Sequence, residues 1–338
     1  MSAEPPPPFN VPASATTVKI SVIDSTVSLP GAPCSILWSP TIKGFDRLKA
    51  GTWCFLIEHP SGRKLIYDLG CRKDWENLPP AVNLKQNIPA DALAYFRVEK
   101  NVAEILTEGG VDLHDIEGVI WSHFHFDHTG DVSTTVQEMD FSESDLRLGR
   151  FEAIDYFGDR SFYILNSPGH AVGHINALAR THASPSPGFI HLCGDTVHHA
   201  GEMRPTPFQP LPDSIEPSPV PRWYATTCPG HIFEPLLRNG SKSEHILESI
   251  DYAAGLDIER KFAGIYDDVA LKESVCKTEE LDADDDVFTI MAHDWSLKGV
   301  IPEWPESLNK WRERRWEQET RWKFLEDFQG ACSPQPDS

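Results

Sequence analysis

The sequence lacks an excess of basic residues, a long apolar run and a leader-like N-terminus. Its 338 residues include 30 Lys and Arg against 51 Asp and Glu, which gives a formal net charge of −21. Nucleic acids and anionic membranes are bound by basic surfaces, so neither is an expected partner. A membrane-spanning helix needs about 20 mostly apolar residues, and no run of that length is present. The N-terminus has no basic segment followed by an apolar one, which predicts a cytoplasmic location.

Cysteine is also sparse and scattered. The 7 cysteines are odd in number, lie between Cys34 and Cys332, and form no C-x-x-C pair. This argues against a disulfide framework and predicts that most of the thiols are buried. The apolar content of 40% includes 10 Trp and 17 Phe, which is enough for a sizeable core.

Segments of strand character alternate with helical and turn-rich segments, which predicts an α/β protein. We expect one domain over residues 17–330, preceded by a Pro-rich N-terminus (1–16) that is disordered or draped on the surface, and followed by a tail (331–338). Strands are expected at 18–24, 52–58, 64–68, 161–166, 188–196 and 287–294.

Three further segments have their own predictions. The Pro-rich stretch 201–240 predicts a long ordered loop or lid. A helix is expected over 243–256, capped by Ser243. The Trp-rich stretch 302–330 predicts an amphipathic C-terminal helix that closes over a sheet, with a homodimer face as the alternative.

One short stretch concentrates imidazoles and a carboxylate. The apolar segment 116–121 has strand character and leads into Ser-His-Phe-His-Phe-Asp-His-Thr-Gly. Side chains alternate along an extended chain, so His123 and His125 point to the same side. Asp127 and His128 follow where the chain bends and face a second point a few ångströms away. Imidazole and carboxylate suit zinc and its neighbours in the first transition row, so the pattern predicts a metal site.

Other polar side chains follow predicted strands in the same way. Asp68 ends the strand 64–68, and His170 lies in a Ser-Pro-Gly-His turn after 161–166. Asp195 follows Cys193-Gly194 at the end of the next strand, and His293 ends the strand 287–294.

In this order the motifs resemble those of the metallo-β-lactamase superfamily, over roughly residues 17–300. The resemblance implies a four-layer αββα sandwich in which Asp68 anchors the metal loops and His174 is not a ligand. It also implies a centre of two divalent ions, most simply zinc, with manganese, iron and cobalt fitting the same ligands. The implied ligands are His123, His125 and His170 for one ion, Asp127, His128 and His293 for the other, and Asp195 as the bridge. The sequence Cys-Pro-Gly-His at 228–231 imitates one motif, but no strand precedes it, and His231 is not expected to be a ligand.

The resemblance is nearest to the quorum-quenching lactonase branch. It implies a hydrolase that opens a small cyclic ester or amide by attack of a metal-bound hydroxide. Those lactonases often place a Tyr three residues after the bridging Asp, where this sequence has His198 followed by His199. Either imidazole is a candidate to hydrogen-bond the substrate carbonyl, and a polar loop without a role is the alternative. The candidate catalytic residues are therefore Asp127, Asp195 and His198.

Other functions within the same superfamily remain alternatives. A thioester hydrolase of the glyoxalase II type would be expected to carry a basic cluster, which is not evident. A phosphoesterase or nuclease is disfavoured by the charge of −21, and a non-catalytic binding module by the complete ligand set. The Pro-rich insertion and the many Trp residues predict an enclosed pocket for a small, fairly apolar ring compound.

Overall fold

Two β-sheets face each other at the centre of the computed structural model, which describes residues 3–78, 93–94, 96–131, 137–250 and 265–333. The first sheet has the order β1-β5-β6-β8, with β1 (Lys19–Asp24), β5 (Trp53–Glu58), β6 (Lys64–Tyr67) and β8 (Ile116–Ile120). The second has the order β17-β13-β12-β11-β10-β9, with β17 (Val287–Ile290), β13 (Gly188–Leu192), β12 (Ile175–His182), β11 (Phe162–Asn166), β10 (Phe151–Asp155) and β9 (Arg147–Leu148).

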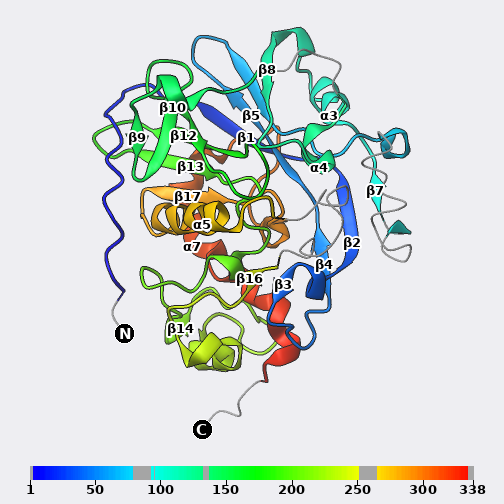
Figure 1. Ribbon diagram of the computed structural model, residues 1–338, viewed down its shortest axis with the longest axis vertical. Helices are drawn as coiled ribbons and strands as arrows, with labels where there is room; N and C mark the ends of the chain where they lie inside the picture. Colours follow the sequence, from blue (N-terminus) through cyan, green and yellow to red (C-terminus); the bar gives the residue numbers. More distant parts are fainter. Residues whose placement is uncertain (1–2, 79–92, 95, 132–136, 251–264, 334–338) are drawn as a thin grey trace.

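Side chains from both sheets meet in one buried cluster, to which Phe55, Ile57, Phe162 and Ile190 belong. On the other face of the first sheet, α3 (Val102–Glu108) buries Val102 and Leu106 against strand residues. On the other face of the second sheet, α5 (Asp268–Asp282) packs beside β17 (Figure 1). The layers are therefore helix, sheet, sheet and helix, as predicted.

The strands agree with the sequence predictions because each is a short apolar run bounded by turn residues. The pairing β5–β6 is antiparallel through the turn at 59–63, whereas β6–β8 and β13–β17 are parallel. Smaller pairings surround the sheets: β2 (Val27–Pro33) with β4 (Arg47–Ala50) and β7 (Arg97–Val98), β3 (Trp38–Ser39) with β16 (Glu248–Ser249), and β14 (Ser214–Ile215) with β15 (Cys228–Pro229).

The chain from 201 to 250 forms a lobe in the lower part of Figure 1, between β13 and α5 in sequence. Its Met203, Leu211 and Phe233 are buried in a second core that also holds Phe324 and Phe328 near the C-terminus. The helix expected over 243–256 is wrong for 243–250, and 251–256 lie outside the described residues. The backbone there bonds to distant partners, because Leu247 N donates to Gly201 O and Ile250 N to Leu37 O.

The C-terminal stretch is helical but not one helix. It consists of a 3-10 turn (Leu308–Lys310), α6 (Trp311–Arg314), α7 (Trp316–Thr320) and a 3-10 segment (Lys323–Ala331). Arg315 has φ +58° and separates α6 from α7, because a left-handed residue ends the helical hydrogen-bond ladder. The segment contributes to the core, since Trp311 is buried in the cluster that holds residues of both sheets.

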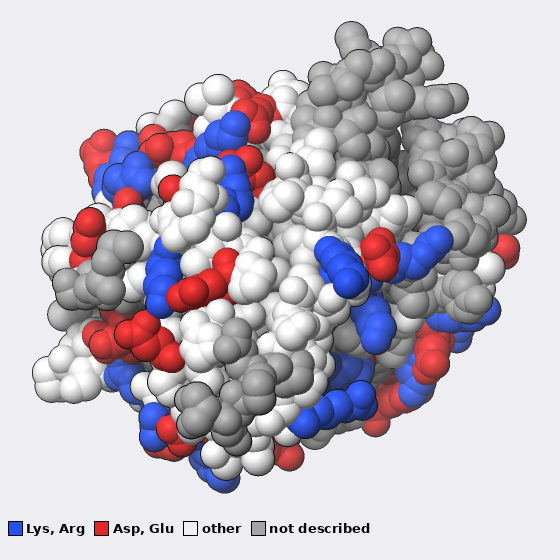
Figure 2. All heavy atoms as spheres, turned by 90° about the horizontal axis from the view of Figure 1, so that it is seen from below, with Lys and Arg blue, Asp and Glu red and all other residues white. Residues whose placement is uncertain are grey.

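The N-terminal residues 3–16 run along the protein without forming a helix or a strand. Phe9 is buried against Phe189 at a centroid distance of 5.8 Å, and Pro12 O accepts a hydrogen bond from Arg180 Nη2 at 2.6 Å. No helix within the described ranges is long and apolar enough to cross a membrane. Figure 2 shows basic and acidic side chains interspersed on the face seen from below.

Candidate metal centre

The candidate site lies where the carboxyl ends of strands from both sheets meet. His170 follows β11, Asp195 follows β13 and His293 follows β17, and these three strands run in one direction. In the first sheet, Asp68 follows β6, and the loop after its parallel neighbour β8 carries His123 and His125. The topology thus gathers residues that are up to 225 positions apart in sequence, counted from Asp68 to His293.

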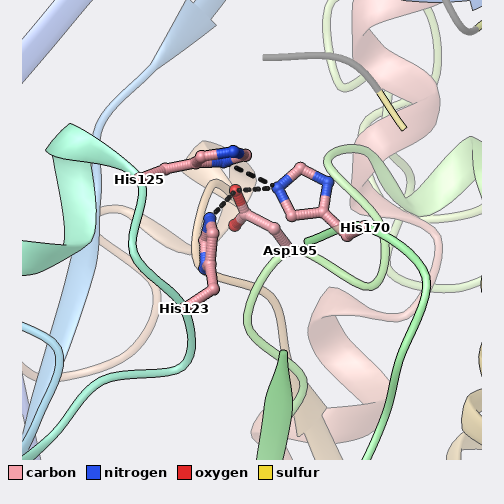
Figure 3. Close-up of side chains that lie close together, drawn as sticks. All are labelled: His123, His125, His170 and Asp195. Atoms are coloured by element: carbon pink, nitrogen blue, oxygen red, sulfur yellow. Dashed lines mark hydrogen bonds and ion pairs between the residues drawn. The ribbon is translucent and has the colours of Figure 1, made fainter. Parts of the chain in front are cut away.

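The structure brings together all seven residues that the resemblance implies as ligands. His123, His125, His170 and Asp195 offer ligand atoms within 4.8 Å of one another (Figure 3). Asp127, His128 and His293 form a second group by the same measure. Asp127 and His128 lie on the short helix α4 (Phe126–Thr129), which turns them away from the preceding extended loop.

The carboxylate of Asp195 lies between the two groups. Its Oδ2 is 3.6 Å from Nε2 of both His123 and His170 on one side. On the other side it is 3.2 Å from His128 Nε2 and 3.3 Å from His293 Nε2. A carboxylate in this position could contact cations held by either group.

Several atoms of this cluster are buried without a hydrogen-bond partner among the described residues. They are His123 Nε2, His128 Nε2 and Asp195 Oδ1. In addition, His125 Nδ1 and His170 Nε2 face each other at 3.0 Å. Buried polar atoms are nearly always satisfied in native proteins, so this convergence of unpartnered nitrogen and oxygen atoms fits bound cations.

The other ring nitrogens are fixed by neighbouring groups. Asp68 accepts hydrogen bonds from Ser122 N (2.7 Å), Ser122 Oγ (2.7 Å) and His128 Nδ1 (2.8 Å). His293 Nδ1 donates to Gly51 O at 2.8 Å. Such partners orient an imidazole so that Nε2 faces the metal. Asp68 thus holds Ser122 and His128 beside the cluster, and its role as an anchor for the metal loops stays a prediction.

His174 also supports the cluster from outside. Its Nδ1 donates to Ser167 O at 2.8 Å, and its Nε2 accepts from the Asp195 backbone N at 3.0 Å. Both nitrogens are engaged by the protein, which leaves neither for a metal. His231 is exposed on the distant lobe and belongs to neither group.

Burial and charge divide the imidazoles into two electrostatic classes. Burial lowers the pKa of His125 to about 4 and holds the pKa values of His123 and His170 well below the usual range. Burial also acts on His293, but the carboxylates of Asp195 and Asp127 outweigh it and raise its pKa to about 9. The site thus attracts positive charge on one side, where protons and divalent cations compete for the same atoms.

The side chains of His198 and His199, which follow Asp195 in the sequence, point in different directions. His198 Nε2 points to Asp195 Oδ2 at 3.4 Å, and its ring lies parallel to that of His293 at 5.8 Å. Its backbone N donates to Glu202 Oε2 at 2.7 Å, which fixes the loop. His199 turns away from the cluster and is buried among aromatic rings. Of the two candidates, His198 is the one that faces the site.

A cavity of about 460 Å³ opens beside His198 and His293. Its walls come from β4, from the segments after β13 and β17, and from the C-terminal 3-10 segment, with Trp295, Phe324 and Asp327 among the lining side chains. None of the lining residues comes from 201–240. Residues of that stretch are buried together with Phe324 in the second core. The role of 201–240 as a lid stays a prediction.

Local sequence patterns did not reveal these walls. Trp295 stacks on Trp53 at 5.2 Å, and its ring occupies the space that a Cβ on Gly51 would fill, 1.9 Å away. Such contacts join distant segments, and the only available signal was the aromatic residue two positions after His293.

Comparisons with known proteins agree with this geometry. The metallo-β-lactamase superfamily model matches residues 49–138. The γ-lactamase FDB1 of Fusarium pseudograminearum (strain CS3096) is 38% identical, over 96% of this chain and 85% of its own length. The metallo-hydrolase mfmC of Annulohypoxylon moriforme is 36% identical, over 97% and 92%. The chain therefore belongs to the metallo-β-lactamase superfamily, which together with the His/Asp cluster implies that it binds divalent metal.

A solved structure shows the same fold. A quorum-quenching N-acyl homoserine lactone lactonase superposes with a TM-score of 0.50 at 16% identity, over 87% of this chain and 99% of that one.

Proposed function

We propose that the protein is a metal-dependent hydrolase that opens a small cyclic ester or amide. The observation that carries the proposal is the convergence of six candidate ligand side chains around a seventh, the buried carboxylate of Asp195, beside an open cavity. The names of the relatives support the bond type, since one is a γ-lactamase and a structural neighbour is a lactone lactonase.

We assign the ligands in two sets around Asp195. The first set is His123, His125 and His170, and the second is Asp127, His128 and His293. Three imidazoles with one carboxylate oxygen, and two imidazoles with two carboxylates, both suit zinc, and manganese, iron and cobalt accept the same atoms. When bound, two such ions polarise a carbonyl and make water acidic enough to act as a nucleophile near neutral pH.

The chain itself positions the substrate. His198 Nε2 lies at the junction of the cavity and the cluster, where an N–H can donate to the carbonyl oxygen that gains charge during attack. Glu202 holds the His198 backbone, so the imidazole needs little rearrangement. Trp295 and Phe324 give the cavity aromatic surfaces, which suit a small, fairly apolar ring compound.

Ring opening by the metal-loaded protein tests the proposal. A lactone and a lactam fused to the same aromatic ring should both be assayed by proton release, with a chelated sample and Asp195→Asn as comparisons. We expect turnover of at least one ring, loss of turnover on chelation, and reduced metal content together with reduced activity in Asp195→Asn, because that side chain touches both groups. Unchanged metal and activity in the variant would contradict the bridging role.

The same experiment distinguishes ring opening from thioester hydrolysis, which is the alternative activity. Full metal binding without turnover of either ring, combined with hydrolysis of a glutathione thioester, would replace ring opening by thioester hydrolysis. Glutathione carries two carboxylates, and the described cavity wall offers Lys49 as its one basic side chain other than histidine.

A further inference from the structure

His199 is the residue after the candidate catalytic imidazole, and the reaction described above gives it no task. It is 6% exposed, and the rings of Trp38, Phe45, Phe324 and Phe328 surround it at centroid distances of 5.1 to 5.7 Å. Two of these rings come from the C-terminal 3-10 segment (Lys323–Ala331). His199 therefore joins the loop that carries His198 to the C-terminal wall of the cavity.

The hydrogen bonds of His199 define where its proton lies. Nδ1 accepts from the backbone N of Gly201 at 3.0 Å, so the ring proton is on Nε2. Nε2 then donates to Asp327 Oδ2 at 3.3 Å. The bond fixes one carboxylate oxygen of Asp327 and leaves the other as an acceptor.

The Asp327 carboxylate lines the cavity and is 46% exposed. Among the described residues, His199 is its one hydrogen-bond and ion-pair partner. Its neighbour Glu326 also lines the cavity, but Lys323 Nζ occupies both of its oxygens at 3.1 and 3.0 Å. Asp327 is thus a fixed, charged acceptor that the protein leaves without a donor on the cavity side.

We propose that Asp327, held by His199, is a specificity-determining residue that accepts a hydrogen bond from the part of the substrate remote from the reacting carbonyl. The inference rests on the proposed ring opening. The substrate class it names is a ring compound with an O–H or N–H donor on its distal edge. An ether oxygen or a carboxylate at that position would instead be repelled by the Asp327 carboxylate, since neither group can donate a hydrogen bond.

The test compares two substrates that differ at one group. An aromatic ring fused to a lactone or lactam carries a hydroxyl at its distal edge in one compound and a methoxy group in the other. The wild-type protein should prefer the hydroxyl compound by about tenfold or more in kcat/KM, because a site built to bond a donor rejects the analogue that lacks it. The preference should lie mainly in KM, because the group is remote from the bond that breaks.

Asp327→Asn is the variant of choice because it keeps the size of the side chain. Its amide oxygen can still accept from His199, while its NH₂ group replaces the acceptor on the cavity side. We expect the hydroxyl preference to fall to about threefold or less, largely through a higher KM for the hydroxyl compound. Asp213→Asn is the matched control, since Asp213 is 94% exposed and pairs with Lys242 away from the cavity.

Binding of the hydroxylated ring-opened product, measured by calorimetry, gives a readout that does not need turnover. Weaker binding to Asp327→Asn than to the control supports the proposal. Equal hydroxyl preference in wild type and Asp327→Asn overturns it while ring opening stands. If the wild type opens neither ring, the proposed function itself is refuted. Equal binding of the product by Asp327→Asn and Asp213→Asn would in that case also show that Asp327 does not contact the ligand.

Discussion

One imidazole outside the metal site makes stability depend on pH. His191 is fully buried on β13, and its Nε2 is 3.2 Å from Asn176 Nδ2, which can donate to it. Burial lowers its pKa to about 3 from an ordinary 6.5. The unfolded chain therefore binds a proton near pH 6.5 that the folded chain does not, so stability is present above that pH and is lost as the pH falls toward about 3.

Replacing His191 by Gln should remove this contribution. Between pH 6.5 and pH 5 the wild type should lose about 1.6 kcal/mol more unfolding free energy than His191→Gln, because the unfolded imidazole is already half protonated at pH 6.5. Urea unfolding at both pH values, with chelator present throughout, measures the difference without a metal contribution. Parallel pH dependence in the two proteins would show that His191 does not stay uncharged in the fold.

The candidate metal site could be predicted because most of its residues follow strands, and strands leave local signals in the sequence. The spacing His-x-His-x-Asp-His predicted a metal site, and the resemblance to the superfamily implied that Asp195 and His293 join it, as the structure places them. The groups that orient them were less visible, because a backbone carbonyl such as Gly51 O leaves no mark in the sequence. The partnership of His199 with Asp327 spans 128 residues and depends on tertiary packing alone.

Helices were harder to predict because tertiary packing, which leaves no local signal in the sequence, also decides where they end. Periodicity suggested one C-terminal helix, yet Arg315 adopts φ +58° between α6 and α7. A non-glycine residue pays a conformational cost in this region that glycine does not. Arg315→Gly should therefore raise the unfolding free energy by about 0.5–1 kcal/mol, measured by urea denaturation.

Arg315→Ala separates backbone conformation from side-chain loss. Both substitutions remove the hydrogen bond from Arg315 Nε to Gln318 at 2.6 Å, but only glycine relieves the left-handed backbone. We expect alanine to be no more stable than wild type. Equal stability of the glycine and alanine variants would mean that the turn does not strain this residue.

The lobe, α5 and the C-terminal stretch are tied together by one buried ion pair. Arg204 Nε and Nη2 donate to the Asp282 carboxylate at 2.7 and 2.5 Å, and Arg204 Nη1 donates to Arg321 O at 2.7 Å. Gln209 Nε2 adds a bond to Asp282 O at 2.6 Å. These bonds connect three distant parts of the chain, so we expect the lobe and the sandwich to unfold in one transition.

Removing one partner of the Arg204–Asp282 ion pair should lower the free energy of unfolding more than removing both partners. Arg204→Met leaves the Asp282 carboxylate buried without its cation and should lower the unfolding free energy by about 3–5 kcal/mol. The double variant Arg204→Met, Asp282→Leu leaves no unpaired charge and should recover most of that loss. Calorimetry and urea denaturation of the single and double variants measure both quantities. A second, lower-temperature transition in Arg204→Met alone would show that the pair joins the lobe to the sandwich, whereas additive losses would show that the two charges act independently.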